Sequence, residues 1–549
     1  MIVTSKISSE VIAFCETSLR LIWGQRKVFT NEMAVPIAIQ LAPIVDSSLS
    51  VAWLVLSLNK KASRPYVRLS NRSILKIPHV DENGKLCLFI DEEELDVFPD
   101  TIKIQKILDR FFEVFIPALN SGQLNNHFHQ EPINYWNVNV SMRNRKGVPK
   151  GGSNTAYLLG ERDKRTKIYD SYNIKGFGYI CGEDNGYRKR FLQSNKSTRE
   201  KISIIEVPIN FSFSPKSWPL TSDDLRRVCN TMAGTKESQR FFDTGKTTQS
   251  KLVVLRAPDC DYGYLISGLG KAQSIYPKYC ERADPRWLFG RYQEKKTQTY
   301  LSAKIAILGA GSLGSHVIQT LAHSGVGELH IIDPDNLSPA NLGRHVLGAT
   351  SIGLPKCSEL ADWLTSSLPN CHLKPTAESA ESWLSRTNLS QFDLVVDLTG
   401  ERTVREEVAI KLDNCSIPVI TAWMEPYVSA AHVMIFQKQK KWMKDGVDLW
   451  DASHAFSNWP SEYILKEPGC SSRFFPYAIS QLAYAAALTA EACLSTLIIS
   501  RSKFMGNVVT VKSWVRGENY TGAQRHKGER RDWAQLPLGL EGALIERVF

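Results

Sequence analysis

The stretch that decides the fold of this 549-residue chain reads Lys304-Ile-Ala-Ile-Leu-Gly-Ala-Gly-Ser-Leu-Gly-Ser315. It predicts a buried strand that runs into a Gly309-x-Gly311-x-x-Gly314 turn and opens a helix. Glycines let the backbone approach a phosphate, and a helix N-terminus offers unpaired N–H groups and the positive end of a dipole. The stretch therefore predicts a nucleotide site, but dinucleotide enzymes share the motif.

Strands and helices alternate on the C-terminal side of this turn. Apolar runs at 328–332, 394–397 and 418–423 are separated by helical patterns. This order predicts a mostly parallel sheet with helices on its faces. Asp333 closes the second strand about 20 residues after the glycine turn, where an acidic residue can meet a ribose hydroxyl.

The residues after that strand separate this chain from a hydride-transfer enzyme; they read Asp333-Pro-Asp335-Asn-Leu-Ser-Pro-Ala-Asn341-Leu-Gly-Arg344. This run resembles the D-x-D-x-V-x-x-S-N-L-x-R run of the ThiF/MoeB and ubiquitin-activating-enzyme family. Lys356 stands close to where that family keeps a phosphate-binding lysine. The resemblance covers roughly residues 285–500 and implies ATP as the cofactor.

The resemblance also implies a role for each residue of the run. Asp333 would hold the ribose, and Asp335 belongs to the same cofactor site. Asn341, Arg344 and Lys356 would hold the triphosphate and the charge that develops when a carboxylate attacks the α-phosphate. Such chemistry needs little covalent help and much positive charge in place.

One position departs from the family pattern. The family usually has D-x-T-D-N after its next strand, where the second aspartate helps to hold magnesium, but this chain reads Asp397-Leu-Thr-Gly400-Glu401. Either Asp397 or Glu401 takes over the Mg²⁺ role, or adenylation is impaired. We favour Asp397, because ligands bind at the carboxyl ends of strands in open α/β sheets; the alternative is that it only caps the next helix.

A cysteine follows a Pro-Gly turn in the stretch Glu467-Pro-Gly-Cys470-Ser-Ser-Arg473-Phe-Phe-Pro476. Arg473 and a helix that Pro476 can start would favour a thiolate. In the family, a cysteine on the crossover loop after the sheet takes the acyl group from the adenylate. Cys470 is our candidate for that nucleophile, and a structural cysteine is the alternative.

A second candidate thiol lies near the N-terminus, in Ile77-Pro-His79-Val-Asp-Glu-Asn-Gly-Lys-Leu-Cys87. The stretch resembles the H-P-N motif and catalytic cysteine of ubiquitin-conjugating enzymes. His79 replaces the asparagine, as in the bacterial branch, and its imidazole N–H can donate to an oxyanion. Ile77 replaces the first histidine, and an Asn-Gly hairpin followed by a buried cysteine would also explain the pattern.

Together these stretches resemble the fused conjugating–activating enzyme of bacterial type II CBASS anti-phage operons. We predict a ubiquitin-conjugating-like α+β domain over residues 1–150 and a linker or inactive adenylation-like domain over 151–280. A ThiF-type adenylation domain follows over 281–549. The resemblance implies a cGAS/DncV-like nucleotidyltransferase as substrate and a homodimeric activating domain, in which Arg286 or Arg291 reaches the partner's nucleotide.

The implied reaction starts when the substrate's C-terminal carboxylate attacks Mg·ATP. Cys470 and then Cys87 carry the acyl group as thioesters, and an amine finally accepts it. A sulfur-carrier adenylyltransferase would share residues 300–430, but it often has C-x-x-C pairs, which none of the eleven cysteines here forms. A non-enzymatic nucleic-acid or scaffold protein would leave the run from Asp333 unexplained.

Composition bounds the remaining function classes. The chain has 67 Lys+Arg and 56 Asp+Glu, a net charge of +11, spread along its length. A diffuse excess favours a solvated surface over a nucleic-acid groove. The N-terminus lacks signal-peptide features, and Tyr477–Ser500 contains Gln481 and Glu491, which favours a buried helix over a membrane span. We expect a cytoplasmic protein.

One histidine pair is a possible decoy. His127-x-His129 suggests a metal, but the downstream Ser and Asp of a JAB-type isopeptidase are missing. We interpret the pair as solvated or core histidines.

Overall fold

The computed structural model describes residues 27–28, 37–40, 52–56, 65–69, 73–88, 95–144, 157–159, 165–174, 178–181, 201–243, 251–268, 273–282, 289, 294–368, 371–412, 417–436, 443–444, 447–448, 450, 453–466, 473–501, 509–515, 524–525 and 543–548. Contacts divide the chain into two units. The first comprises Met1–Cys181 with Ser197–Glu281, and the second comprises Gly182–Lys196 with Arg282–Phe549.

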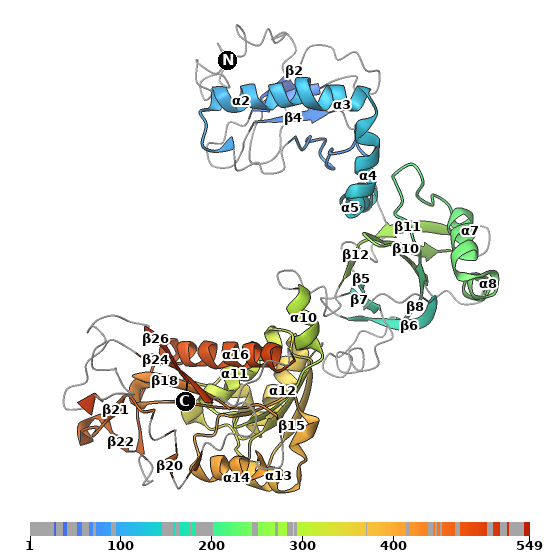
Figure 1. The fold of residues 1–549 in the computed structure, drawn as a ribbon. Coiled ribbons are helices and arrows are strands. Elements are labelled where there is room, and N and C mark those ends of the chain that lie inside the picture. The colour runs from blue at the N-terminus through green and yellow to red at the C-terminus, as the bar shows by residue number, and fades with distance from the viewer. Residues whose placement is uncertain are drawn as a thin grey trace. The chain divides into compact units, whose positions relative to one another are not determined.

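The first unit begins with a four-stranded antiparallel sheet covered by helices, as the α+β prediction requires (Figure 1). The strands, in spatial order, are β1 (Lys27–Val28), β2 (Ile37–Gln40), β3 (Ala52–Leu56) and β4 (Tyr66–Leu69). A helical segment follows the sheet as α2 (Asp100–Asp109), a π-helical stretch (Arg110–Phe115) and α3 (Ile116–Asn120). Its apolar face packs on β4 because Ile104, Ile107 and Phe111 share one core with Val67 and Leu69.

Three short helical elements follow in the same unit. They are a 3₁₀ turn (Gln123–Asn126), α4 (His127–Gln130) and α5 (Pro132–Asn144). Tyr135 and Trp136 of α5 are buried in the core of the next sheet, where the Trp136 indole donates to the carbonyl of Lys278 at 3.0 Å. Helix α5 therefore packs in the core of the next sheet.

The second sheet of the first unit has eight strands, in the order β11-β10-β9-β8-β6-β7-β5-β12. The strands are β5 (Tyr157–Leu159), β6 (Lys167–Ile174), β7 (Gly178–Cys181), β8 (Lys201–Pro208), β9 (Lys251–Arg256), β10 (Asp261–Ser267), β11 (Ser274–Lys278) and β12 (Cys280–Arg282). Two helices, α7 (Ser222–Ala233) and α8 (Thr235–Asp243), lie in the sequence between β8 and β9. Thr221 is the N-cap of α7 and forms a capping box with Asp224.

The second unit holds an eight-stranded sheet in the order β15-β14-β13-β16-β17-β18-β24-β26. Its strands are β13 (Lys304–Leu308), β14 (Glu328–Ile332), β15 (His372–Thr376), β16 (Leu394–Asp397), β17 (Val419–Met424), β18 (Ala430–Phe436), β24 (Val509–Val515) and β26 (Ala543–Val548). The first five strands in this order pair in parallel, and β18, β24 and β26 add on antiparallel. The predicted doubly wound, mostly parallel sheet is confirmed.

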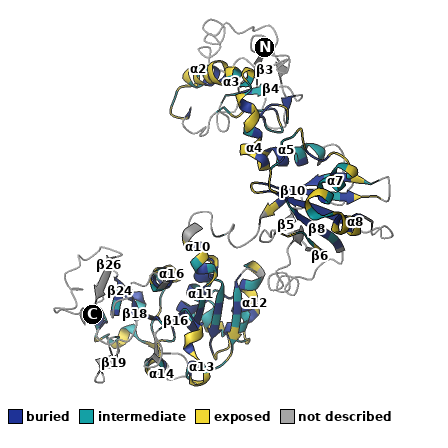
Figure 2. Ribbon diagram, turned by 45° about the vertical axis from the view of Figure 1, so that its right-hand side comes forward, coloured by how far each residue is buried: buried dark blue, intermediate teal, exposed yellow. Residues whose placement is uncertain are grey.

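Helices cover this sheet on its faces: α10 (Glu294–Leu301), α11 (Ser312–His323), α12 (Lys356–Ser367), α13 (Ala380–Arg386), α14 (Arg402–Leu412) and α16 (Ile479–Arg501). Figure 2 shows the strands of this sheet mostly buried. Short strand pairs lie near the C-terminal elements: β19 (Met443–Lys444) with β20 (Val447–Asp448), β21 (Phe456–Ser457) with β25 (Gln524–Arg525), and β22 (Leu465–Lys466) with β23 (Arg473–Phe474).

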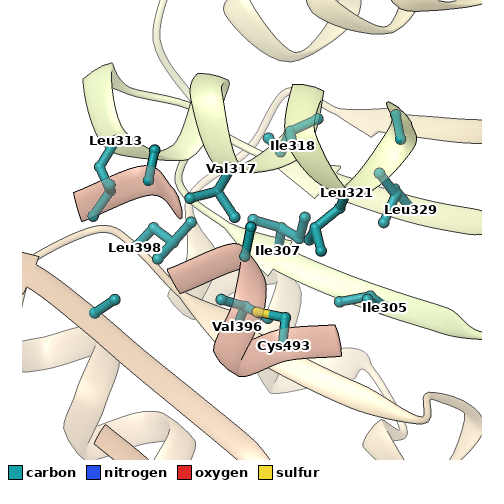
Figure 3. Packing of buried hydrophobic residues seen from close by; sticks show 14 of the residues in the cluster. Ile305, Ile307, Leu313, Val317, Ile318, Leu321, Leu329, Val396, Leu398 and Cys493 are labelled. Carbon is teal, nitrogen blue, oxygen red and sulfur yellow. The ribbon is translucent and has the colours of Figure 1, made fainter. Parts of the chain in front are cut away.

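Helix α16 is the one described helix that is long and apolar enough to cross a membrane, over Ile479–Ser500. Half of that stretch is buried in the protein. Cys493 joins the core formed by Val317 of α11, Ile307 of β13 and Val396 of β16 (Figure 3). The helix therefore serves as a core element of the second unit, as Gln481 and Glu491 in its sequence suggested.

Candidate nucleotide and thiol sites

The glycine turn between β13 and α11 is closed too tightly for most side chains. Gly309 has a φ of +94°, and a Cβ there would press on the backbone of Leu398 and Thr399 at 3.0 Å. A Cβ on Gly314 would overlap the carbonyl oxygen of Gly309. Gly311 differs, because a Cβ on it would meet nothing within 4 Å. The turn thus leaves open space at the N-terminus of α11, where a phosphate fits.

Asp333 ties this turn to the loop after β14. Its side chain is buried, and Oδ2 accepts the N–H of Ala310 at 2.6 Å while Oδ1 accepts the N–H of Asp335 at 2.9 Å. Burial raises the pKa of Asp333, and the two backbone N–H groups oppose that rise. Asp333, which the sequence predicts to hold the ribose, therefore stabilises the conformation of the glycine turn.

Lys356 begins α12 and points its ammonium at the same loop. Its Nζ lies 2.8 Å from Oδ2 of Asp335, and its backbone N–H donates to the carbonyl of Asp335 at 2.9 Å. The lysine side chain is only 9% exposed, whereas that of Asp335 is 65% exposed. The ammonium is thus held in place beside the turn, with a surface carboxylate as its partner.

Asn341 and Arg344 lie on the loop between these residues. Oδ1 of Asn341 accepts both the N–H and the Oγ–H of Ser338 at 3.0 Å, and this caps a 3₁₀ turn (Pro339–Asn341). Nη1 of Arg344 donates to the carbonyl of Ala340 at 3.0 Å, and its own carbonyl accepts from Oγ of Ser312 at 3.1 Å. The backbone of Arg344 is therefore joined to the first turn of α11, whereas the side chains of Asn341 and Arg344 form hydrogen bonds within their own loop.

Asp397 ends β16 next to the glycine turn, because it pairs with Leu308 of β13. Its side chain is fully buried, and burial raises its pKa to about 6, although bonds from Thr399 act in the opposite direction. Oδ1 accepts the N–H and Oγ–H of Thr399, while Oδ2 has no hydrogen-bond partner among the described residues. A buried carboxylate oxygen without a partner fits a cation.

Gly400, where the family pattern has an aspartate, adopts a φ of +74°. That left-handed conformation suits glycine, so the local backbone matches the departure in sequence. No group of three or more His, Cys, Asp or Glu side chains that could hold a metal occurs in the described part of the chain. Mg²⁺ needs fewer protein ligands, since it keeps waters and is commonly held by one or two carboxylates together with substrate phosphates.

Sequence reasoning missed His345, which directly follows the run. Its Nδ1 accepts the N–H of Leu347 at 3.1 Å, so Nε2 carries the proton and donates to the carbonyl of Ala310 at 2.8 Å. Burial lowers its pKa and keeps the ring neutral. His345 thus binds the carbonyl of Ala310, the residue whose N–H is bound by Asp333, and no sequence signal indicated this contact.

A pocket of about 570 Å³ opens beside Arg344. Its other walls include Glu425, Tyr427, Trp450, His454, Phe475 and Tyr477. The hydroxyl of Tyr477 donates to Oγ of Ser312 at 2.7 Å, so this wall is joined to the start of α11. Trp450 lies over the guanidinium of the buried Arg405 at 4.4 Å. Trp450 and Trp459 make ring contacts to Trp423 and Tyr427, respectively.

Three of the predicted residues, Cys470, Arg286 and Arg291, lie outside the described residues. Arg473, near Cys470, is described and pairs with Lys466 between β23 and β22. The helix that we expected to start at Pro476 begins at Ile479 instead. The reason is a local cap: the side-chain oxygen of Gln481 accepts the N–H of Ala478 at 2.9 Å.

Cys87 ends the Asn83-Gly84 turn and is exposed, so the alternative of a buried cysteine is wrong. Its N–H donates to the carbonyl of His79 at 2.8 Å, and the next residues inward, Val80 and Leu86, form a bridge. Gly84 has a φ of +82°, and a Cβ on it would stand 2.6 Å from the carbonyl oxygen of Leu69. The turn is therefore pressed against β4 and presents the thiol outward.

His79 faces Cys87 across this turn in a rare conformation, with a φ of +64°. Its N–H donates to the hydroxyl of Tyr135 at 3.1 Å, and its Nε2 lies 2.7 Å from Nδ1 of His127. Burial lowers the pKa of His79; Glu131 opposes this shift and His127 adds to it. His129, by contrast, is exposed and lines a separate pocket of about 550 Å³. The structure thus separates the two histidines that the sequence grouped.

Comparisons with known proteins find similarity over parts of the chain. Residues 284–515 match the ThiF family. A protein of Enterobacter hormaechei named "ATP-dependent ubiquitin transferase-like protein Cap2" is 37% identical over 127 residues, which are 22% of this chain and 21% of that protein. A Pseudomonas aeruginosa protein of the same name is 22% identical over 460 residues, which are 76% of this chain and 79% of that protein.

Two further comparisons are confined to parts of the chain. "Adenylyltransferase and sulfurtransferase UBA4" of Yarrowia lipolytica is 32% identical over 121 residues, 22% of this chain and 31% of that protein. Among solved structures, E. coli MccB with ATP aligns at 18% identity and a TM-score of 0.31, covering 42% of this chain and 65% of that chain. The chain thus spans between about a fifth and four fifths of these curated relatives.

Proposed function

We propose that this chain, whose residues 284–515 form a ThiF-family domain, is an ATP-dependent ubiquitin-like transferase. In this proposal it activates the C-terminal carboxylate of a protein, carries the acyl group on cysteine thiols and passes it to an amine. The observation that carries the proposal is the open space at Gly311, bounded by the start of α11, with the ammonium of Lys356 held on the adjoining loop. The relatives named Cap2 support the same class of activity.

Charge is what the first step needs from the protein. An attack by a carboxylate on the α-phosphate brings two anions together, so fixed positive groups lower its barrier. Lys356 is largely buried and is paired with Asp335. Triphosphate oxygens would compete with this carboxylate for the ammonium, and they can displace it because Asp335 is exposed and can be solvated by water instead. Arg344 is half-buried on the wall of the adjoining pocket, which is where the attacking carboxylate would approach.

Asp397 is the residue that would hold Mg²⁺, with its unpartnered Oδ2 as the ligand. The cation would neutralise phosphate charge and orient the leaving pyrophosphate. Thr399 keeps the other oxygen engaged through two hydrogen bonds, so the carboxylate is oriented before any ligand binds. Glu401 is less suited, because it is exposed to solvent.

The later steps are proposed to use two thiols. Cys470 would take the acyl group from the adenylate, and Cys87 would receive it by transthiolation before an amine attacks. Exposure of Cys87 beside the half-buried His79 supports the second thioester, since both an incoming acyl chain and an amine need access. We further propose a cGAS/DncV-like nucleotidyltransferase as the substrate, a homodimeric activating domain, a cytoplasmic location and a role in anti-phage defence.

A sulfur-carrier adenylyltransferase is the second candidate. The similarity to the adenylyltransferase and sulfurtransferase of Yarrowia lipolytica favours it, but that similarity spans only 22% of this chain. Such an activity would use the glycine turn and Lys356 in the same way. It would leave the exposed Cys87 and its histidine neighbour without a role.

The test is intact-mass analysis of the full chain with Mg·ATP and a cGAS/DncV-like nucleotidyltransferase, together with ATP–pyrophosphate exchange. Lys356→Ala should abolish exchange, whereas Lys374→Ala, a lysine on the edge strand β15, should leave it intact. Cys470→Ala should keep exchange but lose any thiol-sensitive adduct, and Cys87→Ala should load Cys470 yet form no stable conjugate. Normal exchange in Lys356→Ala would refute the phosphate role, and conjugation by Cys87→Ala at the wild-type rate would remove Cys87 from the scheme.

A further inference from the structure

The backbone of His79 is hydrogen-bonded to Cys87, and the imidazole of His79 pairs with that of His127, a residue without a part in the proposed function. His127, in the short helix α4, lies 48 positions along the chain from His79, yet its Nδ1 is 2.7 Å from Nε2 of His79. The two rings meet edge to face, with centroids 5.0 Å apart. This distance and geometry are those of a hydrogen bond between ring nitrogens.

Both backbone polar groups of His79, the N–H and the carbonyl, are hydrogen-bonded. Its N–H donates to the hydroxyl of the buried Tyr135, and its carbonyl accepts the N–H of Cys87. These bonds hold His79 at a positive φ, a conformation that costs free energy and persists only where the surroundings enforce it. These bonds fix the backbone of His79, and His127 engages one of the two nitrogens of its ring.

Proton counting gives this contact a chemical consequence. A hydrogen bond between two imidazole nitrogens needs a proton on one and a lone pair on the other. When Nε2 of His79 donates to His127, Nδ1 of His79 is left with a lone pair and can accept a proton. Burial lowers the pKa of His79, so the ring is available in this neutral, basic form at neutral pH.

We propose that His127 is a positioning residue and proton partner of His79 in aminolysis of an acyl group carried on Cys87. The inference rests on the proposed function for the existence of that thioester. The amine nitrogen forms its bond to the acyl carbon, and the carbon–sulfur bond breaks with its electron pair going to Cys87. Nδ1 of His79 takes the amine proton while the Nε2 proton moves to His127, and the pair later returns one proton to the thiolate.

The charged and titratable groups around the pair are compatible with this transfer. Glu131, between α4 and α5, acts on His79 electrostatically in the direction that favours its cation. Tyr135 on α5 stays neutral because burial raises its pKa, and the charges of Glu131 and Cys87 raise it further. The charge of Glu131 would stabilise a transient imidazolium, and the neutral phenol of Tyr135 would not compete for the proton.

The experiment follows discharge of a small acyl group from Cys87 in the full chain. Cys87 is acylated with an acetylglycyl thioester of mercaptoethanesulfonate, and its transfer to Nα-acetyl-lysine is measured at Cys87 by peptide mass spectrometry from pH 6 to 9. His127→Ala should slow discharge by about tenfold or more and remove the inflection due to the histidine pair. His127→Asn, which can keep a hydrogen bond to Nε2 but cannot take up a proton, should remain slow.

His129→Ala is the matched control, because it removes an exposed histidine from the same helical turn and should discharge at the wild-type rate. Alkylation of Cys87 by iodoacetamide should be similar in all variants, which shows that the turn is folded. Wild-type discharge by His127→Ala would overturn the inference, and so would full rescue by His127→Asn, since orientation alone would then suffice. Failure of Mg·ATP to load Cys87, by contrast, would count against the proposed function.

Discussion

Two glycine turns present the two candidate sites, and they do so in opposite ways. In the turn before α11, a Cβ on Gly314 would overlap the carbonyl of Gly309; in the turn before Cys87, a Cβ on Gly84 would stand 2.6 Å from the carbonyl of Leu69. Each turn is thus closed against backbone. The first exposes backbone N–H groups and an open space, whereas the second exposes a thiol.

The groups around the two turns differ in burial. Asp333 and Asp397 are 5% and 0% exposed, while Cys87 is exposed and His79 is half-buried. A site for a small anionic ligand can be built from the carboxyl ends of core strands, where dipoles and charges stay fixed. A thiol that must meet other macromolecules has to stand on the surface, so its chemistry depends on neighbours brought from another element.

The largest expected effect concerns the buried carboxylate. Asp397→Asn should lower ATP–pyrophosphate exchange by about 10²-fold, or about 3 kcal/mol, because the neutral amide loses the charge that a cation needs. The melting temperature of the second unit should not fall, since burial already disfavours the ionised form and raises the pKa of Asp397 to about 6. Glu401→Gln is the control for the other carboxylate that the sequence left open. If exchange falls equally in both variants, or only in Glu401→Gln, Asp397 is not the sole carboxylate ligand of Mg²⁺.

Gly314→Ala should cost the second unit about 3 kcal/mol of unfolding free energy, because its Cβ would overlap a backbone oxygen that cannot move without opening the turn. Gly311→Ala is the informative partner. Its Cβ meets nothing within 4 Å, so stability should be kept while ATP affinity falls as the methyl group enters the open space. Thermal unfolding and ATP titration separate the two effects. Unchanged ATP affinity in Gly311→Ala would mean that the phosphates lie elsewhere.

Much of the second unit could be predicted from the sequence because its signals are local. The strand–turn–helix pattern at 304–315 and the alternation after it led to the doubly wound sheet. The residues from Asp333 to Lys356 were assigned to a nucleotide site by their resemblance to the family run, and the structure places them on the loop after β14 and at the start of α12. The left-handed backbone at Gly400 could not be derived from the sequence, although glycine is the residue that adopts this conformation most readily.

Contacts between distant segments were beyond sequence reasoning. His345 supports the glycine turn through a carbonyl 35 residues away, and nothing in its own sequence neighbourhood indicates that partner. His127 was grouped with His129 because they are close in sequence, but tertiary packing turned only one of them toward His79. The start of α16 was misplaced because Gln481 caps Ala478, whereas Pro476 was taken as the first helical residue.

The turn before Cys87 should be less sensitive than the one before α11. Gly84→Ala would force a Cβ into the carbonyl of Leu69 and a side chain into a φ of +82°, so we expect a loss of about 2 kcal/mol in the first unit. Iodoacetamide should then modify Cys87 at an altered rate, since the turn must shift. Asn83→Ala, at the exposed neighbouring position, should change the unfolding free energy and the modification rate of Cys87 only slightly. If Gly84→Ala changes neither the unfolding free energy nor the modification rate, the turn is not closed against β4.

The smallest effect is electrostatic and lies away from both turns. Burial alone would raise the pKa of Glu328, but hydrogen bonds from His330, Lys374 and His372 outweigh it and hold the pKa at about 2, below the usual 4.5. The unfolded chain therefore takes up this proton before the folded chain does. Stability from Glu328 should be complete above about pH 4.5 and should be lost as the pH falls toward 2.

Because the side chain is partly exposed, we expect about 1 kcal/mol from this group instead of the full value of the shift. Urea unfolding of wild type and Glu328→Gln should differ by that amount at pH 6 and converge as the pH falls below 4. A gap between wild type and Glu328→Gln that does not close at low pH would mean that shape, and not charge, makes Glu328 stabilising at this edge of the sheet.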